Sequence, residues 1–219
     1  MKTIKITLNQ QLRQNSILLV LACFAIALLC IRAILTHSLF YGFLPWNLIL
    51  AYIPLAITGY MINRPHLIEK KGYFYPLFFA WLMFLPNAPY ILTDFLHFRR
   101  ETTVPFWMDI LMLISFSLSG VLFGIKSIKQ MFSMLTTRFS YIMVWIIVFN
   151  VCILAGFGIY VGRFLRYNSW DVIHKPFSLI QSIFTSLTSY PECKTAWGVT
   201  LGFGVFLFLM FLMYPDTEN

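Results

Sequence analysis

Six apolar stretches, each about the length of a membrane-spanning helix, constrain the fold of this chain more than any other feature. The hydrocarbon core of a bilayer is about 30 Å thick, and a helix of about 20 apolar residues crosses it. The pattern therefore predicts an all-α, polytopic transmembrane helix bundle with about six spanning helices. The stretches cover residues 16–35, 44–62, 73–98, 107–125, 139–161 and 197–214.

The composition agrees with a membrane protein and excludes several other classes. Of 219 residues, 59% are hydrophobic and only 11% are charged, whereas about a quarter of the residues in soluble domains are charged. The mean hydropathy is +0.77. These values exclude a soluble enzyme, a disordered chain and a nucleic-acid-binding protein, despite the pI of 9.4. We expect one integral membrane domain over residues 1–219, with membrane lipids as partners and no nucleic acid.

The third apolar stretch contains two prolines, Pro86 and Pro89. Proline lacks a backbone N–H group and disfavours helix in the residue before it. We therefore predict a helix over residues 73–85, a break at 86–89 and a short second helix through His97. Irregular backbone at membrane depth is tolerated only where protein or water satisfies it.

The basic residues predict the orientation of the chain. Cytoplasmic loops of membrane proteins carry an excess of Lys and Arg, and the first helix usually dominates. Three basic residues precede the first apolar stretch, and none lies in the loop over residues 36–43. We assign further cytoplasmic basic residues, Lys126 among them, to the loop after the fourth stretch. This pattern predicts a cell-membrane protein with both termini in the cytoplasm.

Over residues 176–189, apolar side chains recur at helical spacing and polar side chains lie on the other face. Such a pattern predicts an amphipathic helix. It would lie on the outer leaflet or cap the bundle, or it would be an ordinary packed loop helix. Both interpretations stay open at the level of sequence. The four cysteines show no paired spacing, so no disulfide or thiolate metal site is predicted.

A first group of polar residues follows the proline break. Tyr90, Thr93, Asp94 and His97 are three or four residues apart and would share one helix face. An ionisable residue in a membrane segment is costly and tends to face the bundle interior with a partner. We predict that Asp94 and His97 are catalytic, and that Asn87 and Tyr90 bind substrate.

A second group follows the fifth apolar stretch. Arg163 and Arg166 are three residues apart, and two guanidinium groups form a natural anion clamp. Asn168 and Asp171 add short polar side chains, and we predict that all four residues bind substrate. The alternative is that the arginines pair with Asp94, Asp109 or Asp171 and neutralise charge. The predicted topology brings both groups, with Asn47 and Asp109, to one end of the bundle.

Two strings in these groups, LPNAPYILTDFLH and GRFLRYNSWD, resemble the signature blocks of an uncharacterised bacterial membrane family, domain of unknown function 1361. Trp46-Asn47 and Trp107-Met108-Asp109 fit the same pattern. The resemblance covers residues 43–176. It implies a polytopic membrane protein and brings no established activity.

Asp94 and His97 also suggest a divalent metal site. Carboxylate and imidazole are ligands for zinc, manganese or iron, and Asp171 or His174 would complete the coordination. The alternative is that Asp94 hydrogen-bonds to His97 or pairs with an arginine and only stabilises the bundle. The cofactor is therefore open, with a divalent metal as one candidate.

Three function classes follow from these residues. The first, which we favour, is an enzyme acting on a lipid-linked or anionic amphiphilic substrate from the extracytoplasmic end of the bundle. The second is a noncatalytic membrane scaffold or accessory subunit. The third is a small-solute transporter or channel, for which an internal repeat with paired broken helices would be expected. The sequence contains no such repeat.

Overall fold

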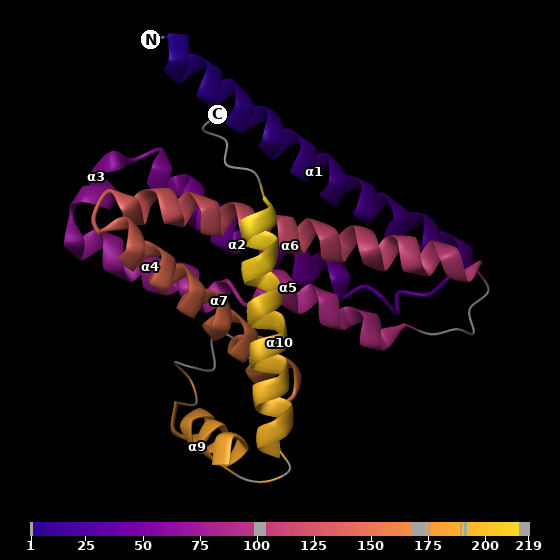
Figure 1. Ribbon diagram of the computed structural model, residues 1–219. Coiled ribbons are helices and arrows are strands. Elements are labelled where there is room, and N and C mark those ends of the chain that lie inside the picture. The colour runs from indigo at the N-terminus through magenta and orange to yellow at the C-terminus, as the bar shows by residue number, and fades with distance from the viewer. Residues whose placement is uncertain are drawn as a thin grey trace.

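The computed structural model describes residues 2–98, 104–167, 174, 176–188, 190 and 192–214 (Figure 1). All regular elements in these ranges are helical, and six helical spans are long and apolar enough to cross a membrane. The predicted all-α membrane bundle is thus confirmed. The six long segments are α1 (Lys2–Thr36), α2 (Leu44–Ile62), α4 (Lys71–Phe84) with its continuation, α6 (Phe106–Thr136), α7 (Tyr141–Arg163) and α10 (Glu192–Met213). The shorter elements are α3 (Pro65–Glu69), α5 (Asn87–Tyr90), η1 (Ile91–His97) and α9 (Pro176–Thr188).

Helix α6 is the centre of the bundle. Its apolar window is 72% buried, whereas the windows of the other spans are 28% to 39% buried. Helices α1, α2 and α5 all pack against it. The helix continues to Thr136, beyond the expected end at residue 125. Lys126 therefore lies inside the helix and is buried, and our assignment of this residue to a loop was wrong.

The proline break lies between α4 and α5. Helix α4 ends at Phe84, and the helical path resumes at Asn87. A Cβ atom at Gly158 of α7 would lie 2.4 Å from Cγ of Pro86, and one at Gly124 of α6 would lie 2.7 Å from Cβ of Ala88. Only glycine allows such close approach, so the break is held between α6 and α7 by small residues.

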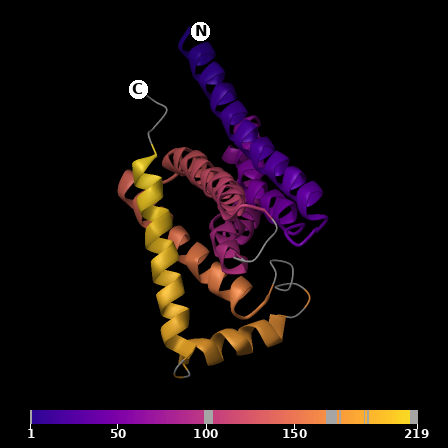
Figure 2. The same ribbon diagram turned by 90° about the vertical axis from the view of Figure 1, so that its right-hand side faces the viewer.

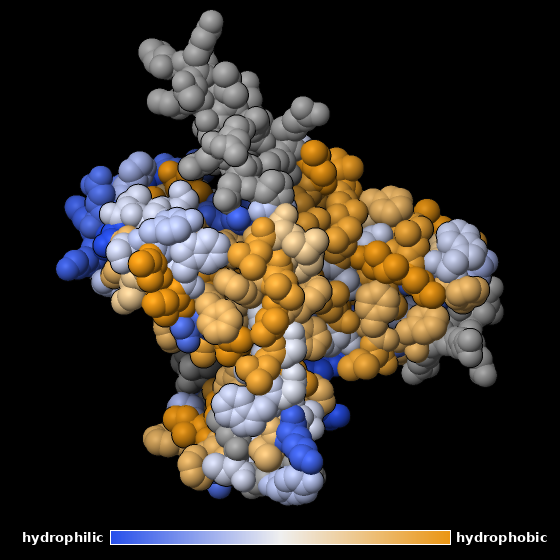
Figure 3. All heavy atoms as spheres, viewed as in Figure 1, coloured by the Kyte–Doolittle hydropathy of each residue, from blue (hydrophilic) through white to orange (hydrophobic). Residues whose placement is uncertain are grey.

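The surface of the bundle has an apolar middle and polar ends. The start of α1 and the end of α10 lie at one end, and α9 lies across the start of α10 at the other (Figures 1 and 2). Hydrophilic side chains gather near α3 and where α9 meets α10, and apolar side chains cover the face between them (Figure 3). This distribution is expected when the apolar middle of a protein lies in the hydrocarbon core of a bilayer.

Candidate functional site

Asp94 lies in η1 and is 1% exposed. The side-chain amide of Asn47, in the first turn of α2, donates a hydrogen bond of 2.8 Å to its Oδ2 atom. The guanidinium of Arg163, the last residue of α7, is 3.6 Å from its Oδ1 atom. A buried carboxylate is costly unless it is paired and hydrogen-bonded. Asp94 has both kinds of partner, and they come from two other helices.

Arg163 joins the end of α7 to η1. Its Nη2 atom donates to the backbone oxygen of Thr93 at 2.9 Å and is also 2.9 Å from Nδ1 of His97. Its Nη1 atom is 3.4 Å from the hydroxyl oxygen of Tyr90. A guanidinium has donors and no acceptor, so Nδ1 of His97 accepts this bond and the proton of the neutral ring is on Nε2. The His97 residue is exposed, and its ring lies 5.2 Å from that of Phe43, centroid to centroid.

We call Asn47, Asp94, His97 and Arg163 the Asp94 cluster. The segment that carries Asp94 and His97 is a 3₁₀ helix rather than the expected α-helix. With three residues per turn, the side chains of Asp94 and His97 lie on the same side of the helix, one turn apart. Tyr90 and Thr93 are also three residues apart and lie next to them. This register allows one guanidinium to reach Asp94, His97 and Thr93 together.

A second ion pair lies at the same end of the bundle. Nε of Arg32, near the end of α1, is 2.6 Å from Oδ1 of Asp109, in the first turn of α6, and both side chains are buried. The guanidinium of Arg32 also lies 4.4 Å from the ring centroid of Tyr41. The hydroxyl of Tyr41 donates to the backbone oxygen of His97 at 3.4 Å. Tyr41 therefore links this pair to the Asp94 cluster.

The sequence did not predict Arg32 as a residue of the candidate site. The sequence nevertheless contains a pattern that favours the pairing of Arg32 with Asp109. An arginine in the last turns of one apolar span and an aspartate in the first turn of another span meet when the spans end and begin on the same side. In a low-dielectric region such charges pair.

The second predicted polar group does not lie on a single helix. Helix α7 ends at Arg163, and Arg166 follows with a φ angle of 60° and an exposed side chain. The two arginines therefore do not share a helix face. Asn168 and Asp171 lie outside the described residues.

A cavity of about 300 Å³ opens beside the Asp94 cluster. Its walls are mainly apolar and come from α2, α4, α7 and α9. Neutral polar groups of Asn47, Asn87, Tyr90 and Tyr167 lie on its lining. Asn47 belongs to the Asp94 cluster and Tyr90 contacts Arg163 of that cluster, so the cluster lies at one edge of this apolar cavity. The apolar lining residues are Trp46, Leu50, Leu82, Met83, Pro86, Phe157, Gly158, Val161, Gly162, Leu179 and Ile183.

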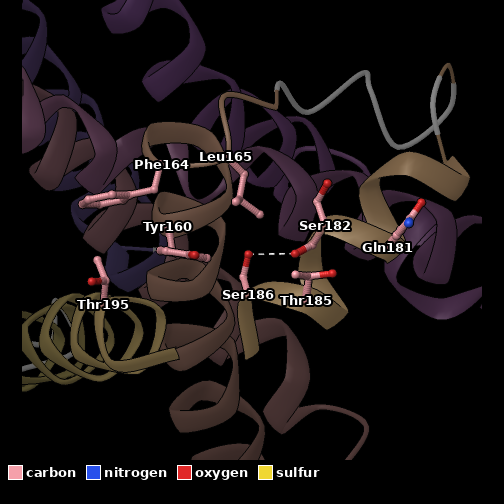
Figure 4. A pocket seen from close by; sticks show the side chains of 8 residues that line it. All are labelled: Tyr160, Phe164, Leu165, Gln181, Ser182, Thr185, Ser186 and Thr195. Carbon is pink, nitrogen blue, oxygen red and sulfur yellow. Dashed lines mark hydrogen bonds between the residues drawn. The ribbon is translucent and has the colours of Figure 1, made fainter. Parts of the chain in front are cut away.

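A second cavity, of about 500 Å³, lies between the end of α7, α9 and the start of α10 (Figure 4). We call it the hydroxyl-lined cavity. Ser186 and Thr185 project from α9, Thr195 projects from α10, and the ring of Tyr160 comes from α7. The full lining is Tyr160, Phe164, Leu165, Gln181, Ser182, Thr185, Ser186 and Thr195.

The sequence matches the family described as Protein of unknown function (DUF1361) over residues 46–210. The chain belongs to this family. Neither a curated protein nor a solved structure matches it. The DUF1361 match begins in α2 and ends in α10, so it contains Asn47, Asp94, Asp109 and Arg163. Arg32, in α1, precedes the matched region.

In this DUF1361 chain the space between Asp94 and His97 holds the guanidinium of Arg163. A metal ion bound by both side chains would have to displace that cation. Within the described ranges, no three His, Cys, Asp or Glu side chains gather closely enough to hold a metal. The geometry corresponds to the alternative interpretation, in which Asp94 pairs with an arginine. The metal site stays a prediction.

Proposed function

We propose that this DUF1361 protein binds an amphiphilic, lipid-like molecule, with its apolar chain in the apolar cavity and the polar groups next to that chain beside the Asp94 cluster. One observation carries this proposal. The cavity has apolar walls from four helices and neutral hydrogen-bonding groups, Asn47 and Tyr90, beside the cluster. Pockets that combine apolar walls with a few placed polar groups are typical ligand sites.

The charges of the Asp94 cluster support a positioning role for Asp94. Its carboxylate is buried and occupied by Asn47 and Arg163, so it has little surface to offer a ligand. It holds the amide of Asn47 at the edge of the cavity and keeps the guanidinium of Arg163 in place. In this proposal Asn47 and Tyr90, which line the cavity, meet the ligand, and His97 lies beyond the lining residues.

A second candidate function, an enzyme acting on the bound amphiphile, is favoured by one feature of His97. Its imidazole is exposed while Arg163 donates to Nδ1, which fixes the tautomer with the proton on Nε2. A neutral imidazole fixed in this tautomer can donate a hydrogen bond from Nε2 to a substrate oxygen on which negative charge develops. The positive-inside pattern of the sequence would put this chemistry on the extracytoplasmic side.

The binding proposal is tested by native mass spectrometry of the protein purified from its membrane. We expect a bound species of lipid mass on the wild type. Leu50→Trp fills the cavity and is expected to reduce occupancy at least tenfold. Ile49→Trp is the matched control, because the neighbouring side chain is 56% exposed and lies outside the cavity lining. Equal occupancy in both variants, or an empty wild type, would contradict the proposal.

A further inference from the structure

The hydroxyl-lined cavity has a chemical character different from that of the apolar cavity. Hydroxyl or amide groups come from Gln181, Ser182, Thr185, Ser186 and Thr195, and no charged side chain is among its described lining residues. The hydroxyl of Ser186 donates to the backbone oxygen of Ser182 at 2.7 Å, which leaves its oxygen as an acceptor. The opposite wall is apolar and aromatic.

This lining matches a ligand that is itself rich in hydroxyl groups. A hydroxyl both donates and accepts hydrogen bonds, so each can pair with another without leaving an unpaired charge. An anion held there would need charged donors, since burying an unpaired charge is costly. The ammonium of Lys194, beside Thr195 in sequence, donates to the hydroxyl of Tyr190 at 2.9 Å and is not part of the lining.

The aromatic side of the cavity also fits a hydroxyl-rich ligand. The rings of Tyr160 and Phe164 are stacked, with centroids 5.5 Å apart and planes inclined by 20°. A sugar ring has hydroxyl groups at its edge and C–H groups on its faces. A cavity with hydroxyl groups on one side and aromatic rings on the other can contact both.

The two cavities share walls. Leu179 and Ile183 of α9 line the apolar cavity, whereas Ser182 and Thr185 of the same helix line the hydroxyl-lined cavity. Tyr167 lines the apolar cavity, and its hydroxyl oxygen is 3.1 Å from Oγ of Ser182. The contact between Tyr167 and Ser182 therefore lies at the boundary where the two cavities adjoin.

The outer face of α9 is apolar. Phe177, Ile180 and Phe184 are 87%, 63% and 70% exposed. A helix with its apolar face outward and hydroxyl groups inward fits a lipid surface outside and a polar ligand inside. Helix α9 lies across the start of α10, at one end of that apolar span (Figure 2).

From these observations we infer that the hydroxyl-lined cavity binds an uncharged, hydroxyl-rich headgroup, such as a sugar, of the amphiphile whose chain occupies the apolar cavity. The inference rests on the proposed function, which supplies the chain site. It names the class of that ligand as a neutral glycolipid.

The experiment uses the full chain in phosphatidylcholine nanodiscs that contain either monoglucosyldiacylglycerol or phosphatidic acid with the same acyl chains. Native mass spectrometry measures the bound probe. We expect the wild type to retain the glucosyl lipid at least tenfold more than phosphatidic acid. The double variant Thr185→Val with Thr195→Val removes two hydroxyls at nearly constant volume and is expected to abolish this preference. Thr188→Val, on α9 but outside the lining, is the matched control and should keep it.

Two results would overturn the inference. One is equal or stronger retention of phosphatidic acid by the wild type. The other is an unchanged preference in the double variant, whose folding is checked by its melting temperature.

Two further arms separate this inference from the proposed function. Leu50→Trp should lose the glucosyl lipid if the chain occupies the apolar cavity. If Leu50→Trp and wild type retain it equally and both bind free methyl glucoside, the headgroup site is supported and the proposed chain site is overturned.

Discussion

At the scale of single residues, the two buried ion pairs determine how this end of the bundle is held. Breaking a buried pair by removing one partner costs about 3–5 kcal/mol, because an uncompensated charge is left behind. Replacing both partners with apolar residues can be nearly neutral. Arg32 and Asp109, which are both buried, are the clearest case for this comparison.

We expect Asp109→Leu to lower the free energy of unfolding by about 3–5 kcal/mol, and the double variant Arg32→Met with Asp109→Leu to recover most of it. The measurement is reversible unfolding in mixed detergent micelles. If the double variant loses as much unfolding free energy as Asp109→Leu and Arg32→Met lose together as single variants, the two residues do not act as a pair.

A second residue-scale prediction separates positioning from ligand contact. Asp94→Asn removes the charge beside Arg163 and is expected to cost about 3 kcal/mol of stability, with loss of the bound amphiphile. His97 is exposed, so His97→Ala should change stability by only about 0.5 kcal/mol while it weakens binding or turnover. Thermal unfolding and native mass spectrometry on the same samples make the comparison. A large loss of stability in His97→Ala would assign it a structural role.

Part of the candidate site was predictable from residue spacing, and part was not. The polar groups of Asp94 and Arg163 follow helices that run in the same direction, and Asn47 begins a helix that returns from that side. Topology alone therefore predicts that they gather. The pairing of Arg32 with Asp109 was predictable only in part, because the spans bring these two charges to the same side but other charges at that end were equally eligible partners.

At the scale of elements, the break after α4 is determined by how closely other helices approach it. Pro86 lies against Gly158 of α7, where a Cβ atom would be only 2.4 Å from the proline ring. The prolines predict that a break exists. They do not predict the 3₁₀ form of η1.

We expect Gly158→Ala to destabilise the protein by about 1–3 kcal/mol, because the added methyl group overpacks the break. Gly202→Ala is the control, since no atom lies within 4 Å of the new Cβ position. In that helix interior, alanine should be neutral or stabilising by about 0.5–1 kcal/mol. The melting temperatures in detergent test this order, and a Gly158→Ala protein as stable as the control would contradict the packing argument.

At the scale of the whole molecule, the position of Cys193 gives a test of orientation. It lies at the start of α10, partly exposed, at the end that carries α9. If the termini are cytoplasmic, an impermeant thiol reagent should label Cys193 on intact cells. The other described cysteines lie in α1 and α7, within apolar spans. The Cys193→Ser variant should lose the signal, and labelling only after lysis would indicate the opposite orientation.

The central place of α6 has a consequence for how the protein enters its membrane. Helix α6 contains Lys126, which is 4% exposed and whose ammonium has no hydrogen-bond partner among the described residues. A lysine at the centre of an isolated helix in lipid costs about 2.5–3.5 kcal/mol during insertion. Packing of α1 and α2 against α6 covers much of its surface. We therefore expect α6 to enter the bilayer packed against the three spans that precede it, which are α1, α2 and the α4–η1 segment, rather than alone.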